Sequence, residues 1–121
     1  MTKELLLIGD FAGVGKVSLS VMTPILTKKN RTLNYLPTAV VSNSFDYGDA
    51  VVQELTEFMR NSTQMWQKHG FQFDLVTTGF IFSQEQVEII QSLLTSQKQK
   101  PYLIVNSTPK VGHNFGVFLY D

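Results

Sequence analysis

The chain has 121 residues, 43% of them hydrophobic, and a formal net charge of zero, which suits one soluble domain and gives no electrostatic case for binding nucleic acid or an acidic membrane surface. It has no cysteine, so disulfide frameworks and thiolate chemistry are excluded and a cytoplasmic location is expected. No apolar stretch approaches the roughly 18 residues that span a membrane, and the first residues are too charged for a signal peptide.

The first part of the chain is typical of a strand, a glycine-bearing turn and a helix in succession. The apolar run Leu5–Gly9 predicts the strand, and Gly13 and Gly15 lie in the turn. The amphipathic segment Lys16–Lys29 predicts the helix. A turn of this kind lets backbone N–H groups approach a ligand at the start of a helix.

This turn nearly matches two phosphate-binding motifs and satisfies neither. A Walker A loop, GxxxxGK[ST], fails because Gly9 lies one residue too far from Gly15, and because Val17 replaces the hydroxyl residue that holds magnesium. The dinucleotide pattern GxGxxG fails because Ser18 stands at its third glycine and no acidic residue follows about 20 residues later. A tight turn without a ligand is the alternative interpretation.

Three more strands and two more helices are predicted further along. The strands are mostly continuous apolar runs, as in parallel sheets covered on both faces. A proline at position 37 is expected to limit pairing of the strand Leu33–Val41. One helix has a glycine stop at position 70, and the other follows a capping box at 83–86. The strands are Leu33–Val41, Phe73–Thr78 and Tyr102–Asn106, and the helices are Asp49–His69 and Ser83–Gln97.

The resulting order, βαβαβαβ, predicts an α/β fold with three layers, helices on both faces of a mainly parallel sheet. Ligands of such sheets bind at the carboxyl ends of the strands. Here these ends are Asp10, residues 41–44, residues 78–80 and the segment from Asn106 onward. For Asp10, a functional role and a capping role are both open. One edge of so small a sheet is expected to lack a neighbour.

Two other site classes are disfavoured. A receiver domain of two-component signalling needs an acidic cluster after the first strand and an aspartate after the third, whereas Asp10 stands alone and Asp74 precedes its strand. The two histidines, His69 and His113, are too isolated for a metal site, so no metal ligand and no catalytic residue is assigned.

Several segments share their order and spacing with one family of kinases. They are Gly9–Leu19, Pro24–Leu26, Leu36–Ser42, Phe73–Phe80, and Ser83 with Glu85 and Gln86. Together they resemble the pyridoxal/pyridoxamine kinases of the ribokinase-like superfamily, and most of all the bacterial branch whose first loop reads Asp-Phe-Ala-Gly. The resemblance extends through the whole chain, residues 1–121, as the N-terminal half of a ribokinase-like domain.

The resemblance implies ATP-dependent phosphorylation, with Mg²⁺, of the 5′-hydroxymethyl group of a vitamin B6 form (a vitamer). It implies that the vitamer contacts Asp10 after the first strand, then Ala39, Val41 and Ser42 after the second, with the ring of Phe80 covering the pyridine. Members of the family are commonly dimers, so a homodimer is expected on the same basis. The related hydroxymethylpyrimidine is an alternative substrate.

The sequence also departs from the family pattern. The family continues the serine loop with His-Thr-Gly, where this chain has Ser44-Phe45-Asp46, and a polar clamp on the substrate is absent. The Asp-Pro and Gly-Asp groups that organise magnesium and phosphate are replaced in the region of Asn106 and His113, which are the residues implied for the cofactor side.

The family's anion hole, its catalytic aspartate and most of its adenine site lie in a later half that these 121 residues do not include. Phosphoryl transfer needs positioning, metal and charge stabilisation together. We therefore expect a short or truncated relative of the kinases that does not catalyse by itself. The alternatives are a non-catalytic module that binds the vitamer or another chain, and a remnant without activity.

Overall fold

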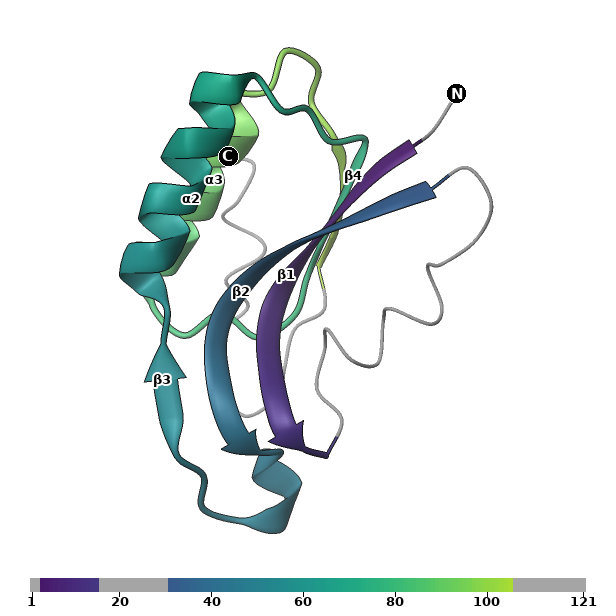
Figure 1. Cartoon of the computed structure of the whole chain (residues 1–121). Coiled ribbons are helices and arrows are strands. Elements are labelled where there is room, and N and C mark those ends of the chain that lie inside the picture. Colours follow the sequence, from purple (N-terminus) through teal and green to yellow (C-terminus); the bar gives the residue numbers. More distant parts are fainter. Residues whose placement is uncertain (1–2, 16–30, 106–121) are drawn as a thin grey trace.

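The computed structural model describes residues 3–15 and 31–105. A five-stranded sheet forms its centre, in the order β3-β2-β1-β4-β5 (Figure 1). The central strand β1 (Lys3–Val14) pairs in parallel with β2 (Arg31–Asn43) and with β4 (Leu75–Thr78). At one edge β5 (Tyr102–Val105) is parallel to β4, and at the other β3 (Val52–Glu54) is antiparallel to β2. The predicted α/β fold with a mainly parallel sheet is confirmed.

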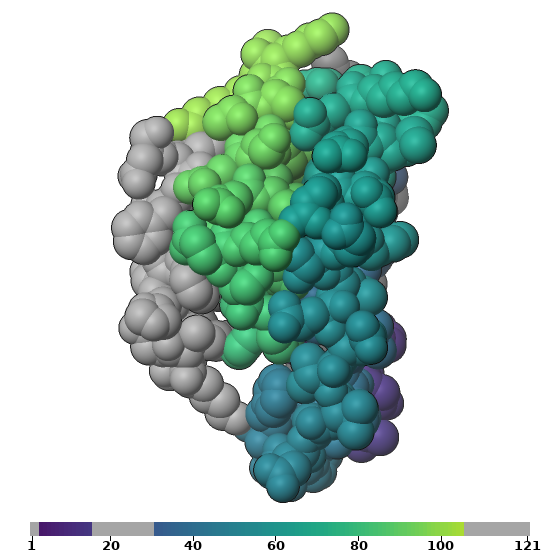
Figure 2. Space-filling view, turned by 90° about the vertical axis from the view of Figure 1, so that its left-hand side faces the viewer, coloured from purple at the N-terminus to yellow at the C-terminus, as the bar shows by residue number. Residues whose placement is uncertain are grey.

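Two helices lie side by side on one face of this sheet (Figures 1 and 2). The first, α2 (Thr56–His69), ends at Gly70, which adopts a left-handed conformation with φ of 73° and donates its N–H to the carbonyl of Gln67. The second, α3 (Gln84–Thr95), begins after Ser83, whose hydroxyl accepts the N–H of Gln86. Both predicted helix boundaries, the glycine stop and the serine cap, are confirmed.

The core lies between the sheet and these helices. Each apolar side chain removed from water there stabilises the fold by roughly 1.5–3 kcal/mol. The contributing side chains are Leu6, Ile8, Leu36 and Val76 from the strands, and Met59, Val87, Ile90 and Leu93 from the helices. The helix predicted for Lys16–Lys29 lies outside the described residues, and the third layer stays a prediction. Among the described residues, no helix is long and apolar enough to cross a membrane.

A bulge changes the sheet where β1 and β2 pass beyond β4. Gly9 is opposite Pro37, but Phe11 is opposite Val40, so β2 contains one more residue than β1 between these pairs. An extra residue reverses which side chains face each side of a strand. The consecutive bulge residues Thr38 and Ala39 are therefore both fully buried, and Val40, which follows them, is exposed.

Beyond this bulge, β1 and β2 form a curved ribbon that leaves the rest of the sheet (Figure 1). Pairing of β1 with β4 ends at Ile8 and Thr78, whereas pairing of β1 with β2 continues to Val14 and Asn43. The carboxyl edge of the sheet is thus a corner, with the ends of β4 and β5 on one side and the ribbon on the other.

Three predictions about local structure are wrong in detail. The first strand continues past Gly9 to Val14, and β2 pairs with β1 on both sides of Pro37, from Arg31 to Asn43, with a break at the bulge. Proline is tolerated there because the bulge follows directly and β3 pairs only with residues 39–41 of β2.

The segment predicted as the start of the helix Asp49–His69 instead forms β3. The N–H of Ser42 donates to the carbonyl of Val51, and the N–H of Leu55 donates to that of Thr38. These bonds satisfy the outer edge of β2, which a helix starting at Asp49 would leave unpaired.

Candidate functional site

The candidate site lies in the corner where β4 ends and the ribbon begins. The N–H of Gly79 donates to the carbonyl of Ile8 at 2.6 Å, which fixes the turn after β4 directly against β1. The next residues in both segments therefore meet at this edge: Asp10 follows in β1, and Phe80 follows in the turn. Carboxyl edges of parallel strands are where α/β sheets bind ligands.

Asp10 is the acidic residue of this corner. It lies at the bulge, two residues beyond the last pairing of β1 with β4, and only 3% of its surface is exposed. A carboxylate is costly to bury unless polar partners surround it. Because β1 continues to Val14, Asp10 does not directly precede a helix, which disfavours the capping role and leaves the functional role as a prediction.

Phe80 is tied to the bulge by a hydrogen bond. The hydroxyl of Thr38 donates to the carbonyl of Phe80 at 3.0 Å, and Thr38 is itself fully buried. Ala39, the next residue of β2, is also fully buried. The structure thus brings together three of the substrate-side residues predicted from the sequence, namely Asp10, Ala39 and Phe80.

Val41 and Ser42 lie further along the ribbon. Val41 is buried opposite Ala12, whereas Ser42 is exposed. The hydroxyl of Ser42 donates to Asn43 Oδ1 at 2.7 Å and accepts the N–H of Val51 at 2.8 Å. Its polar atoms therefore stabilise the connection between β2 and β3, and the structure does not bring its hydroxyl into the corner with Asp10.

An aromatic cluster covers the same corner. The ring of Phe80 lies 4.3 Å from that of Phe82 and 6.2 Å from that of Phe45, measured between centroids. Phe45 belongs to the short 3-10 helix η1 (Phe45–Tyr47) that follows β2, and all three rings are half-buried. Phe82 was not predicted as part of the site, although the alternation Phe80-Ile81-Phe82 after a strand end was a usable signal.

Gln86 fixes the turn that holds these rings. Its buried side-chain amide accepts the N–H of Phe82 at 3.0 Å, and donates to the carbonyl of Thr38 at 3.0 Å and to the hydroxyl of Thr56 at 3.2 Å. One side chain of α3 therefore connects the turn after β4, the bulge of β2 and the start of α2. From the sequence, Gln86 is predicted only as part of the capping box before α3.

Close to this network, the hydroxyl of Thr78 is buried at the last position of β4 without a hydrogen-bond partner. Such groups are uncommon in folded proteins. It adds an unused polar atom to the edge where β4 ends.

The cofactor side is not defined by these residues. Asn106 and His113, the positions implied for it, lie outside the described residues. Within residues 3–15 and 31–105, no group of three or more histidine and acidic side chains is arranged to hold a metal ion. The single carboxylate of Asp10 does not make up the oxygen-rich set that Mg²⁺ prefers. The described residues therefore do not fit a magnesium site.

The fold is similar to that of ribokinase-like α/β kinases. Solved structures similar to the chain are pyridoxal and phosphomethylpyrimidine kinases, which confirms the resemblance inferred from the sequence. No protein-family model matches the sequence, and no curated protein matches it significantly.

One similar structure is a putative phosphomethylpyrimidine kinase from Bacteroides thetaiotaomicron, solved with pyridoxal. It is 31% identical, with a TM-score of 0.80 over 88% of this chain and 37% of that chain. Pyridoxal kinase from Lactobacillus plantarum is 27% identical, with a TM-score of 0.78 over 86% and 37%. Pyridoxal kinase from Entamoeba histolytica, at 16% identity, shows the fold alone, with a TM-score of 0.72 over 88% and 40%. The chain thus spans about two fifths of the length of these kinases.

Proposed function

We propose that the chain forms the vitamer-binding side of a pyridoxal/pyridoxamine kinase cleft, as the N-terminal part of a ribokinase-like domain. The observation that supports this most is the corner itself, where buried Asp10 and the ring of Phe80 lie at the carboxyl edge of a parallel sheet. A carboxylate beside a flat aromatic ring suits a heteroaromatic ligand with polar substituents. A related chain of 31% identity was solved with pyridoxal.

In this proposal, each part of the corner has a separate role. Phe80 contacts one face of the pyridine ring, and Phe45 and Phe82 hold Phe80 in place. Asp10 accepts a hydrogen bond from a polar group on the ring. Ala39 and Val41 support the ribbon from beneath, since their short side chains are buried. Ser42 contributes through the geometry of the ribbon, since its hydroxyl is occupied.

Phosphoryl transfer by the family requires ATP with Mg²⁺, and these 121 residues are proposed to be insufficient for it. The described residues do not form a metal site, and the chain spans only 37% of the Bacteroides kinase. A coupled ATP-consumption assay with pyridoxal and the pure 121-residue chain is expected to show no turnover. Turnover above a no-protein blank would contradict this part of the proposal.

Binding is tested separately, by calorimetric titration with pyridoxal. We expect saturable binding at one site, and we expect Phe80→Ala to weaken it about fivefold because ring stacking is worth on the order of 1 kcal/mol. Phe58→Ala is the matched control, since Phe58 lies on α2 with half of its surface exposed. Equal affinities of the two variants would refute the role assigned to Phe80.

A second candidate function is an interaction module, and the edge of the sheet favours it. Within the described residues, β5 pairs only with β4. Tyr102 and Ile104 on this strand are 82% and 49% exposed. Edge strands of this kind pair readily with another chain, either a second copy or a separate polypeptide. A concentration-independent monomer in analytical ultracentrifugation would count against this candidate.

A further inference from the structure

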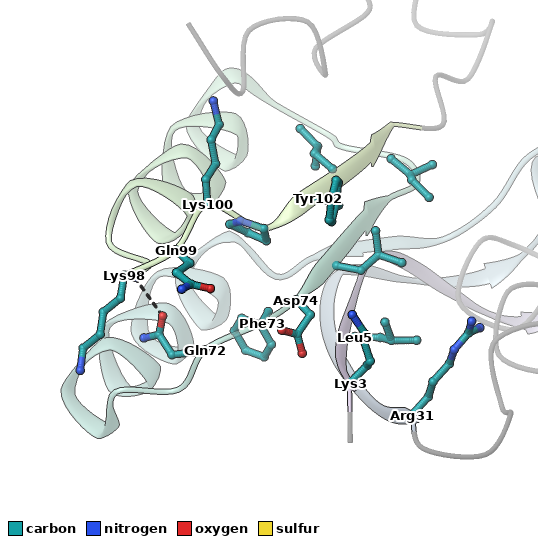
Figure 3. Close-up of a pocket in the computed structure, with 14 residues that line it drawn as sticks. Lys3, Leu5, Arg31, Gln72, Phe73, Asp74, Lys98, Gln99, Lys100 and Tyr102 are labelled. Carbon is teal, nitrogen blue, oxygen red and sulfur yellow. Dashed lines mark hydrogen bonds between the residues drawn. The ribbon is translucent and has the colours of Figure 1, made fainter. Parts of the chain in front are cut away.

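A groove opens at the opposite end of the sheet from the candidate site, where β1, β2, β4 and β5 begin (Figure 3). Its volume is about 880 Å³. Residues from all four strands and from the segment before β5 line it, among them Lys3, Arg31, Asp74, Tyr102 and Ile104. None of the residues assigned to the vitamer corner lines this groove.

Two cations lie next to each other on one wall of the groove. Lys3 and Arg31 are the first pair in the parallel register of β1 and β2, and both are exposed. Within residues 3–15 and 31–105, no carboxylate forms an ion pair with either of them. Like charges directly opposite each other on neighbouring strands are destabilising. An anion bound between them would remove this repulsion.

One carboxylate, that of Asp74, also faces the groove. Its Oδ2 accepts the N–H of Glu4 at 2.7 Å, so it is already held by the backbone of β1. The carboxylate of Glu4 accepts a hydrogen bond from the side-chain amide of Asn34. Among the described residues, neither acid forms an ion pair with Lys3 or Arg31. Lys98 and Lys100 also line the groove, so its cations outnumber Asp74, and the groove favours an anion.

The other wall contains an aromatic ring, with Lys98, Gln99 and Lys100 lining the groove beside it. Tyr102 is 82% exposed and Ile104 is 49% exposed, and as alternate residues of β5 they point to the same side of the strand. Leu5 and Leu75 lie between Tyr102 and the cations, because Leu5 pairs with Leu75 and Leu75 pairs with Tyr102.

The spacing between the two walls sets the size of a ligand. Tyr102 is two strands from β1, or roughly 10 Å across the sheet, and Lys3 is two residues, or roughly 7 Å, before Leu5. A simple inorganic anion held at the cations is too small to reach the tyrosine ring.

We propose that this groove binds an organic anion that contains a flat ring, with the anionic group between Lys3 and Arg31 and the ring against Tyr102. The site is separate from the vitamer corner and does not depend on the function proposed for it. It accounts for two neighbouring cations that form no ion pair within residues 3–15 and 31–105, and for a largely exposed tyrosine. The kinase resemblance assigns no role to either feature.

The test is a titration of the 121-residue chain with phenyl phosphate, followed by amide chemical shifts in NMR, with inorganic phosphate and phenol as comparison probes. We expect saturable shifts at Lys3, Leu5 and Tyr102, and at least tenfold weaker binding of either comparison probe. Lys3→Gln and Arg31→Gln should each weaken phenyl phosphate several-fold. Tyr102→Ala should weaken phenyl phosphate while leaving inorganic phosphate unchanged.

Lys68→Gln is the matched control, because Lys68 is an exposed cation in the last turn of α2. The Lys68→Gln variant should bind phenyl phosphate as tightly as the unaltered chain does. Circular dichroism confirms that each variant is folded, and Lys3→Arg should retain binding. The proposal is overturned if phenyl phosphate does not saturate, or if Lys68→Gln weakens binding as much as Lys3→Gln. It is also overturned if inorganic phosphate binds equally well, which would indicate an adventitious ion only.

Discussion

Replacing Gln86 by leucine removes the side chain that connects three elements at the candidate site. The amide makes three side-chain hydrogen bonds, to Phe82, Thr38 and Thr56, and it is fully buried. Leucine has a similar volume, so the main loss is polar. The carbonyl of Thr38 keeps a bond from the N–H of Leu55, whereas the N–H of Phe82 loses the partner that Gln86 provides.

At about 1 kcal/mol for each buried hydrogen bond, we expect the free energy of unfolding to fall by about 3 kcal/mol. For a domain of this size, that corresponds to a decrease in Tm of roughly 10 °C. Urea unfolding followed by circular dichroism measures the change. Gln84→Leu is the matched control, since Gln84 is exposed at the first position of α3, and it should change stability by less than about 0.5 kcal/mol. If both variants are equally stable, the role assigned to Gln86 is refuted.

Two further predictions concern the backbone around the site. Gly15→Ala should lower the free energy of unfolding by about 1–3 kcal/mol more than Gly48→Ala does in the same assay. Both glycines have positive φ, but only at Gly15 would an added Cβ lie 2.7 Å from the Cβ of Ser44. Equal losses would show that the close approach is unimportant. Ser83→Ala should cost about 1 kcal/mol through loss of the cap on α3, while Ser92→Ala, on the exposed side of α3, should cost much less. A Ser83→Ala variant as stable as the unaltered chain would contradict the capping role.

The sequence was sufficient for the fold class because its apolar runs are nearly continuous. Residues Leu5 to Ile8 are all buried, as expected for a central strand covered on both faces. The glycine at position 70 indicated the end of one helix because it adopts a left-handed conformation. The serine at position 83 indicated the start of the other because its hydroxyl accepts a hydrogen bond from a free N–H. Such signals depend on a few neighbouring residues.

Features that depend on distant partners could not be predicted in the same way. The strand β3 exists because β2 has an open edge, although Val51 and Val52 also fit a helical apolar stripe. The bulge that buries Ala39 follows from how β1 and β2 pair, and neither strand shows it alone. The occupied hydroxyl of Ser42 likewise depends on the position of Val51, nine residues later.

Within the candidate site, Asp10 and Phe80 could be predicted because each comes two residues after the last pairing of β1 with β4, and this edge of an α/β sheet is where ligands bind. The bonds that hold them could not. Gln86 reaches Thr38 across 48 positions of the sequence, and only the folded chain brings these residues together. The resemblance to kinases supplied the expected chemistry, and the structure supplies the supporting contacts.

The most direct test of the central claim is to locate pyridoxal on the chain by amide chemical shifts in NMR. The account predicts that pyridoxal shifts the signals of Asp10, residues 38–41 and residues 79–82 saturably, and leaves Lys3 and Tyr102 at the opposite end of the sheet unchanged. No saturable shift at the carboxyl edge, or shifts confined to the opposite end, would contradict the claim that this chain forms the vitamer side of a kinase cleft.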